Sequence, residues 1–205
     1  MAGAVDICNI ALTNLGEQKI VSLDENNERA RLSKLRFDDV RDTVLRLHPW
    51  NCVTARTILN RDTDTPAWGY TYQYSLPSDC IRVLSIHDAT IAYRIEGSKL
   101  HTDSGTIKLK YIQRPSDLTV LDANVVNLIG IRLAWELAEP LTAKTALKTE
   151  MWQKFTLELA TTRSMDATEG TPEYFHGSTW LDGRMGAFTD PWKPIDAPAE
   201  GYSKI

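Results

Sequence analysis

The strongest constraint on the fold is a change in the spacing of apolar residues around His48. Upstream, apolar residues recur every three or four positions along a charged stretch, which is the spacing of one face of a helix. Downstream, Tyr70, Tyr72 and Tyr74 alternate, which places them on one side of an extended segment. Prolines follow His48 and Leu76, and a residue before proline disfavours helical geometry. The chain is therefore expected to pass here from helices to a β-sheet, and we refer to residues 48–86 as the seam.

Helical spacing predicts two helices before the seam and two after it. They are expected over residues 4–15, 25–47, 124–139 and 143–165. Gly16 suits the position that follows the first helix, and residues 52–59 are expected to add a short helical turn. Amphipathic helices must bury their apolar faces, so the four are expected to pack as an antiparallel bundle.

Capping residues and a proline predict where these helices begin and end. Ser22 or Asp24 is expected to cap the second helix, because Glu25 follows Ser22 at the spacing of a capping box. Pro140 is expected to end the third helix, since proline lacks an amide hydrogen and clashes with the preceding turn. Thr142 would then cap the fourth helix.

Strand signals separated by turn-forming residues fill the region between the two helix pairs. Strands are expected over residues 70–75, 80–86, 91–95, 99–102 and 106–112. Apolar residues alternate with Lys108 and Lys110, which is typical of a sheet with one face in water. Two tryptophans, Trp50 and Trp68, are expected to cover the place where this sheet rests on the helices. The predicted fold class is α+β, a bundle of about four helices with an inserted small antiparallel β-sheet.

Composition divides the chain into four regions. Residues 1–59 and 116–166 are expected to form the two halves of the bundle, residues 60–115 the inserted sheet region, and residues 167–205 an extended C-terminal arm. Glycines and prolines interrupt the arm, yet it keeps six aromatic residues, which a disordered tail would normally lack. These candidate partner-binding residues are Tyr174, Phe175, Trp180, Phe188, Trp192 and Tyr202. The alternative is an arm that folds back on its own bundle.

Spaced residues just before and along the seam resemble a known family. They are Arg41, Asp42, Val44 and Leu45, then Pro49-Trp50-Asn51, then Pro66-Ala67-Trp68-Gly69-Tyr70, Tyr72 and Tyr74, then Leu76-Pro77, Asp79-Cys80 and Arg82-Val83. In this order they resemble the tail tubular protein A family of short-tailed bacteriophages. The resemblance covers about residues 6–167 and is loose beyond them.

The resemblance implies a structural adaptor between the head and the tail of a virion. Members of this family form a twelve-fold ring under the capsid portal, which receives the tail nozzle, tail tubular protein B, and surrounds double-stranded DNA without reading its sequence. The arm would then lie on a neighbouring subunit or on the portal. The densely charged helix 25–47 would either face water or pair with neighbouring subunits in the ring.

Charge and cysteine content limit the remaining function classes. A formal net charge of −4 and an isoelectric point near 5.6 argue against a dedicated nucleic-acid binder, which normally carries a basic patch. The three widely spaced cysteines, Cys8, Cys52 and Cys80, are expected to be free thiols in a reducing compartment. No secretory leader or membrane-spanning stretch is recognisable, so synthesis in the host cytoplasm and no membrane partner are expected.

Motifs for chemistry are missing from the sequence. It contains no P-loop, GxSxG, HExxH, EF-hand or paired-cysteine zinc spacing, so no cofactor, metal or catalytic residue is expected. His101, Asp103 and Ser104 are close in sequence, but a catalytic triad is assembled in space and this segment is expected to be a turn. Asp62 and Asp64 alone do not make a cation site.

Two other functions stay open at this point. An envelope-glycan hydrolase needs two carboxyl groups at a suitable separation, and no pair is preferred among Asp62, Asp64, Asp79, Asp88, Glu96 and Asp103. A DNA-binding connector would need a basic face, for which the candidates are Arg82, Arg94, Lys99, Lys108 and Lys110, with Tyr93 and Tyr111 as stacking residues. A steep dependence of DNA binding on salt would favour the connector, whereas little binding near physiological salt would fit the adaptor.

Overall fold

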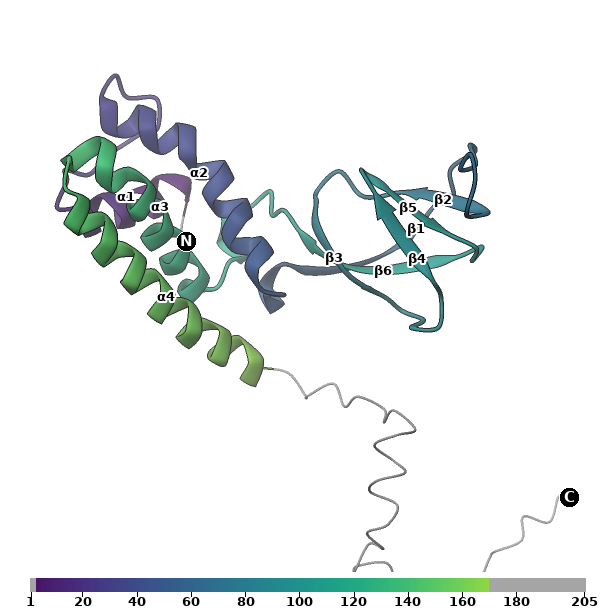
Figure 1. The fold of residues 1–205 in the computed structure, drawn as a ribbon. Coiled ribbons are helices and arrows are strands. Elements are labelled where there is room, and N and C mark those ends of the chain that lie inside the picture. The colour runs from purple at the N-terminus through teal and green to yellow at the C-terminus, as the bar shows by residue number, and fades with distance from the viewer. Residues whose placement is uncertain (1–2, 170–205) are drawn as a thin grey trace, which may run out of the picture. The chain divides into compact units, whose positions relative to one another are not determined.

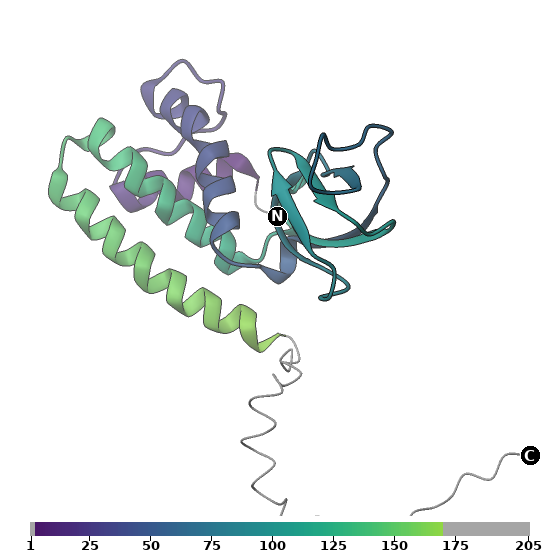
Figure 2. The same ribbon diagram turned by 45° about the vertical axis from the view of Figure 1, so that its right-hand side comes forward.

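The computed structural model describes residues 3–169 of the 205-residue chain. Two helices precede the β strands in the chain and two follow them, as expected for an α+β protein, and the four helices lie together beside the β region (Figure 1). The helices are α1 (Ala4–Leu15), α2 (Glu28–Leu47), α3 (Ala123–Thr142) and α4 (Thr145–Thr168). The α3 helix contacts each of the other three, so it forms the centre of the bundle. Figure 2 shows α4 running alongside α3.

The first helix has the predicted bounds and ends at the predicted glycine. The Asp6 carboxylate accepts a hydrogen bond of 2.8 Å from the Gly3 amide, which satisfies one of the free donors at the helix start. At the other end Gly16 takes a left-handed conformation with φ of 73°, which glycine adopts without steric cost. The side chains of Ile7, Cys8 and Leu12 are fully buried, so this helix gives one face to the core.

The second helix begins three residues later than predicted. Its N-cap is Asn27, whose Oδ1 accepts a hydrogen bond of 2.7 Å from the Ala30 amide. Glu25 does bond back to the Ser22 amide at 3.0 Å, but this closes a separate turn in the preceding loop. The prediction at Ser22 or Asp24 was wrong because an asparagine closer to the helix offers an equally good cap.

The prediction that Pro140 ends the third helix was also wrong. The α3 helix continues through Pro140 to Thr142, and it ends at Ala143, which has a left-handed φ of 53°. The Ala143 amide donates to the Glu139 carbonyl at 3.0 Å, so the last turn is closed in spite of the proline. Lys144 is the N-cap residue of α4, and Thr142 is not, although its Oγ1 accepts from the Lys144 amide at 3.3 Å.

The β region contains six strands in two antiparallel sheets rather than in one. The strands are β1 (Thr54–Leu59), β2 (Tyr72–Ser75), β3 (Cys80–Ile86), β4 (Tyr93–Glu96), β5 (Lys99–Thr102) and β6 (Ile107–Gln113). Sheet A has the order β1-β6-β3, and sheet B has the order β2-β5-β4. Leu59, Tyr74, Leu100, Leu109 and Tyr111 belong to the buried apolar cluster of this region.

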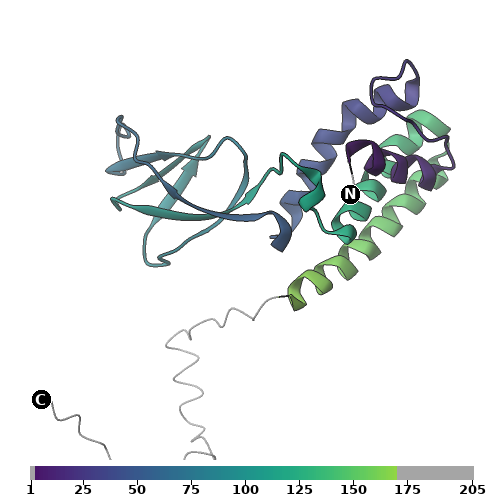
Figure 3. The ribbon, with the colours of Figure 1, turned by 180° about the vertical axis from the view of Figure 1, so that it is seen from behind.

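The segment 52–59 was wrongly predicted as a helical turn. A single 3₁₀ turn, Asn51–Val53, is followed directly by β1, which pairs with β6 along its whole length. Thr54, Thr57 and Ile58 are β-branched and suit a strand, but the partner strand lies about fifty residues further along the chain. Figure 3 shows β1 and β6 running side by side as they leave the helices. The β region therefore begins at Thr54.

The two tryptophans of the seam have different places. Trp50 is fully buried in the helical core, where its indole nitrogen donates to the Val44 carbonyl at 3.1 Å. Trp68 lies in the loop before β2 and is 87% exposed, so it does not cover the contact between helices and strands as predicted. Ile112 of β6 fills that contact instead, because it is buried in the helical core cluster.

Two arginines also join the end of α2 to β3. The Arg46 guanidinium donates to the Ile81 carbonyl at 2.5 Å, and the Arg82 guanidinium donates to the Arg46 carbonyl at 3.1 Å. Beyond β6, Arg114 forms an ion pair of 2.6 Å with Asp42 of α2. These contacts connect the sheet to the helix that precedes it in the chain.

Candidate partner-binding site

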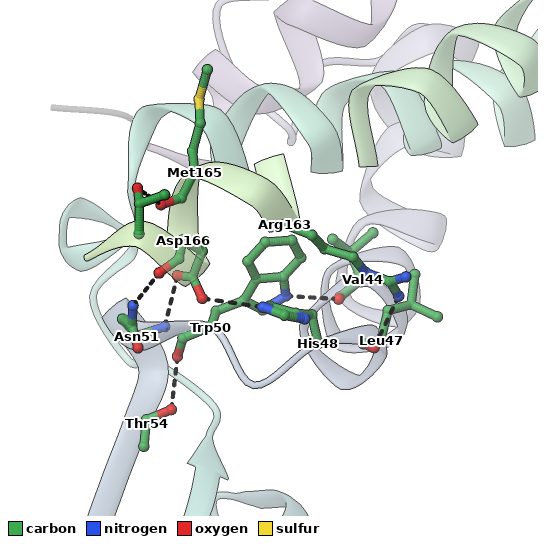
Figure 4. A network of polar contacts seen from close by, with 10 residues as sticks. Val44, Leu47, His48, Trp50, Asn51, Thr54, Arg163, Met165 and Asp166 are labelled. Atoms are coloured by element: carbon green, nitrogen blue, oxygen red, sulfur yellow. Dashed lines mark hydrogen bonds and ion pairs between the residues drawn. The ribbon is translucent and has the colours of Figure 1, made fainter. Parts of the chain in front are cut away.

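The seam meets the end of α4 in a network of polar contacts centred on Asp166 (Figure 4). One carboxylate oxygen of Asp166 accepts from the Asn51 amide at 3.0 Å, and the other lies 3.2 Å from Nε2 of His48. The Asn51 side-chain amide donates to the Asp166 carbonyl at 2.8 Å. The Asp166 side chain is only 13% exposed, so these contacts are partly shielded from water.

The sequence of the seam explains why these groups are available. His48 is extended, with φ of −141° and ψ of 151°, because Pro49 follows it. The helix therefore stops at Leu47 and leaves its last carbonyls without partners in the helix. Arg163 of α4 donates to the Leu47 carbonyl at 3.1 Å, and the indole nitrogen of the buried Trp50 donates to the Val44 carbonyl.

The consequence is that the last turn of α4 is held against the start of the β region. Glu169, the last described residue, follows Asp166 by three positions. We call the contacts of Asp166 and Arg163 with His48, Asn51 and Leu47 the α4 anchor. The six aromatic residues predicted to bind a partner, Tyr174, Phe175, Trp180, Phe188, Trp192 and Tyr202, all lie outside the described residues.

Large apolar side chains are exposed on both the helical and the β parts. Leu35 on α2 is 66% exposed and Leu157 on α4 is 72% exposed. In the β region, Ile58 is 62% exposed and Trp68 is 87% exposed. Single exposed apolar residues are ordinary, but a tryptophan that is almost fully exposed in a loop is the kind of residue that anchors a protein partner.

Aromatic and basic side chains form a cluster between α3 and α4. The Arg132 guanidinium carbon lies 4.0 Å from the ring centre of Trp135, and the Trp152 ring lies 5.3 Å from the Trp135 ring. Desolvation by burial lowers the pKa of Arg132, and the Glu136 carboxylate at 3.2 Å opposes this effect. Trp152 remains 44% exposed, so the cluster reaches the surface. Both tryptophans fall in segments predicted to be helical, but the sequence did not indicate that Arg132 contacts both rings.

The charged face of α2 is largely paired within the chain. Arg41 lies 2.9 Å from both Asp38 and Asp42, and Lys34 lies 2.6 Å from Asp24. The hydrogen bond and charge of Lys34 lower the pKa of Asp24. Since these residues already have partners inside the chain, the structure supports a paired surface and gives no separate support to contacts with neighbouring subunits.

The residues proposed for a basic face are divided between the two sheets. Arg94 on β4 and Lys99 on β5 belong to sheet B, where Arg94 lies 3.7 Å from Glu96 and Lys99 forms an ion pair with Asp62. Arg82, Lys108 and Lys110 belong to sheet A. Arg56 of β1 is also in sheet A and was missed, because its segment was predicted to be helical.

Most of the carboxyl groups proposed for glycan hydrolysis are engaged in local structure. Hydrogen bonds lower the pKa values of Asp62, Asp88 and Asp103, mainly from Lys99, Thr90 and Thr71 respectively. A general acid at neutral pH would need a raised pKa instead. Asp79 accepts from the Gln113 side chain at 2.7 Å.

Nor are His101, Asp103 and Ser104 arranged as a triad. The Asp103 carboxylate faces Thr71, accepting from its amide at 2.8 Å and from its hydroxyl at 2.7 Å. The Ser104 hydroxyl donates to the Thr106 carbonyl at 3.2 Å, and His101 lies 3.9 Å from Glu96. Within residues 3–169 there is also no group of three or more histidine, cysteine, aspartate or glutamate residues placed to hold a metal ion.

Comparisons with protein-family models and with curated proteins identify no relative of this chain. Among the helices that the structure describes, none combines the length and the apolar character needed to cross a bilayer. No protein-family model matches the chain, and no curated protein matches it in sequence.

Proposed function

We propose that the chain is a structural virion protein that acts as a head-to-tail adaptor. In this proposal many copies close a ring, twelve in the virion, that binds the capsid portal on one side and the tail nozzle, tail tubular protein B, on the other. Double-stranded DNA passes through the lumen. The role is structural rather than enzymatic, and the place of action is the junction between the head and the tail.

The observation that supports this proposal best is the distribution of exposed apolar side chains. Leu35 and Leu157 project from two different helices, while Ile58 and Trp68 project from the β region. A subunit of a closed ring needs two different lateral surfaces, and an adaptor needs further surfaces for the proteins above and below it. Anchoring residues on several elements suit that requirement better than one concave site would.

The resemblance of the seam residues gives the proposal its specific form. Trp50 and Asn51 lie within the resembling stretch, and both are placed in or beside the α4 anchor. That stretch therefore includes residues that fix the end of the bundle, from which the arm with its six aromatic residues continues.

The test is the mass of the purified full-length protein, alone and mixed with its portal ring, by light scattering or native mass spectrometry. A ring alone, or a stoichiometric complex with the portal, is expected. A monomer that ignores the portal would contradict the adaptor function.

A further inference from the structure

One face of sheet A collects positive charge. Strands β1, β3 and β6 contain four charged residues, Arg56, Arg82, Lys108 and Lys110, and all four are basic. The six acidic residues between positions 54 and 114 lie in loops or in sheet B. Sheet A is thus a basic element in a chain whose formal net charge is −4.

The pairing of the strands places three of these residues side by side. Arg56 lies opposite Lys110, and Ile58 lies opposite Lys108, in the antiparallel pair of β1 and β6. On the other side of β6, Ser85 of β3 also lies opposite Lys110. Directly opposite residues share a face of the sheet, and so do residues two apart on one strand. We call Arg56, Ser85, Lys108 and Lys110 the cation face.

The two faces of the sheet differ in burial as well as in charge. Leu109 and Tyr111, which alternate with the two lysines on β6, are buried in the apolar cluster of the β region. Arg56 and Lys108 are exposed, and the intervening Ile58 is 62% exposed. This part of the cation face is therefore open to a partner.

Ion pairs within the described part of the chain compensate the cations of sheet B but not Arg56 and Lys108 of sheet A. In sheet B, Lys99 forms an ion pair with Asp62 and Arg94 forms one with Glu96, so the charges of both cations are largely compensated. Arg56 and Lys108 form no ion pair with another residue in the range 3–169. Lys110 has an interaction of its own, and the inference does not depend on its being free.

We propose that the cation face contacts the phosphate backbone of duplex DNA. Lysine, arginine and serine side chains are the groups that proteins commonly direct at phosphate oxygens, and such contacts carry no sequence information. A sheet face with flexible cations offers no helix to enter a groove, which suits DNA that must slide past. The biological meaning rests on the proposed adaptor ring, in which this face would line the passage.

The expected binding is weak and depends on salt. Each neutralised phosphate contributes a slope of about −0.9 to the logarithmic dependence of affinity on salt. Arg56 and Lys108 together would give a slope of about −2 per copy, far from that of a dedicated DNA-binding protein. Repetition around a ring would make the summed interaction stronger than that of one copy.

The experiment measures the binding of the full-length protein to a short fluorescent duplex of mixed sequence, by anisotropy over a range of salt concentrations. The test variant combines Arg56→Gln with Lys108→Gln. The control combines Arg94→Gln with Lys34→Gln, which removes the same charge from residues that have partners in the chain. We expect the test pair to reduce the salt slope by about 2, since each phosphate contact contributes about 1, and the control pair to leave it unchanged.

Thermal melting of both variants verifies that they are folded. Absence of binding by the unchanged protein at low salt, or an equal loss in the two variants, would overturn the proposal. A test variant that no longer binds the portal but binds DNA normally would show that the face contacts a protein. This result too would overturn the proposal. Because the DNA measurement needs no portal, its failure can be told apart from a failure of the adaptor function.

Discussion

Gly130 shows how closely α3 approaches α1. A Cβ atom added at Gly130 would lie 2.5 Å from Cγ2 and 2.9 Å from Cβ of Ile10. In a free helix, alanine would be favoured over glycine by about 1 kcal/mol. Overpacking of a close contact costs about 1–3 kcal/mol, and here the atoms in the way belong to the branched part of a side chain. We therefore expect Gly130→Ala to lower the free energy of unfolding by about 0–2 kcal/mol in urea denaturation, toward the upper end because the added Cβ would lie so close to Ile10.

A second change tests the cause of that loss. Ile10→Ala removes Cγ2, the nearer of the two atoms that the new methyl group would meet, so adding it to Gly130→Ala should cost less than Ile10→Ala costs alone. Additive losses, or a Gly130→Ala variant as stable as the unchanged protein, would show that α3 can shift away from α1.

The Cys8 thiol should be the least reactive of the three. Burial raises its pKa to about 12. Burial also raises the pKa values of Cys52 and Cys80, which are half-buried. Because the thiolate is the reactive form, a raised pKa leaves less of it at pH 8. Alkylation followed by peptide mass spectrometry should label Cys8 last in the folded protein, and denaturant should remove the difference; early labelling of Cys8 would contradict its burial.

At the scale of whole elements, Asp166 joins the end of α4 to the seam. Asp166→Ala removes the acceptor of the Asn51 amide and the partner of His48. Leaving a shielded donor without its acceptor lowers the free energy of unfolding by about 1–3 kcal/mol, and partial access to water here favours the lower end of that range. We expect faster amide hydrogen exchange in the last turns of α4, with little change in α1.

The control for this variant is Asp38→Ala. Asp38 pairs with Arg41 on α2, but its side chain is 74% exposed, so the loss should be about 0–1 kcal/mol. The exchange rates of Asp166→Asn should lie between those of Asp166→Ala and Asp38→Ala, because asparagine keeps one carbonyl acceptor. Equal exchange rates in the Asp166→Ala and Asp38→Ala variants would mean that the anchor does not hold α4.

Elements with strong local signals could be predicted from the sequence. The bounds of α1, β3 and β5 match because capping glycine, alternation and turn residues all lie within a few positions of them. The start of β1 was missed, since its strand character depends on β6, which is distant in sequence. Pro140 was misjudged because a closing hydrogen bond from Ala143 to Glu139 stabilises the final turn of α3 beyond it.

The sites were less predictable than the elements. The link between Asn51 and Asp166 spans 115 positions, and no local pattern indicates it. Arg56 joins the cation face only through the register of β1 on β6, which a helical interpretation of that segment concealed. Periodicity indicates which side chains share an element, whereas contacts between elements depend on the packing of the complete fold.

At the scale of the whole molecule, the described body and the arm should be separable. Residues 1–170 form one compact unit, and its helical and β cores are built from residues before position 160. Deleting residues 171–205 is therefore expected to leave the thermal melting of the body unchanged. A truncated protein that melts at a lower temperature would favour the alternative in which the arm packs on its own bundle.

The adaptor function further requires that the truncated chain attach less well to its portal ring. Aromatic side chains supply most of the energy at such contacts, since they bury large areas at little entropic cost. In the full-length chain, Trp180→Ser with Trp192→Ser should therefore reduce the portal-bound fraction measured by native mass spectrometry. Lys193→Ser with Lys204→Ser changes the same segment without removing an anchor and should bind normally. Portal attachment that survives both the deletion and the tryptophan changes would assign portal binding to the exposed side chains of the body, with Trp68 the first to substitute.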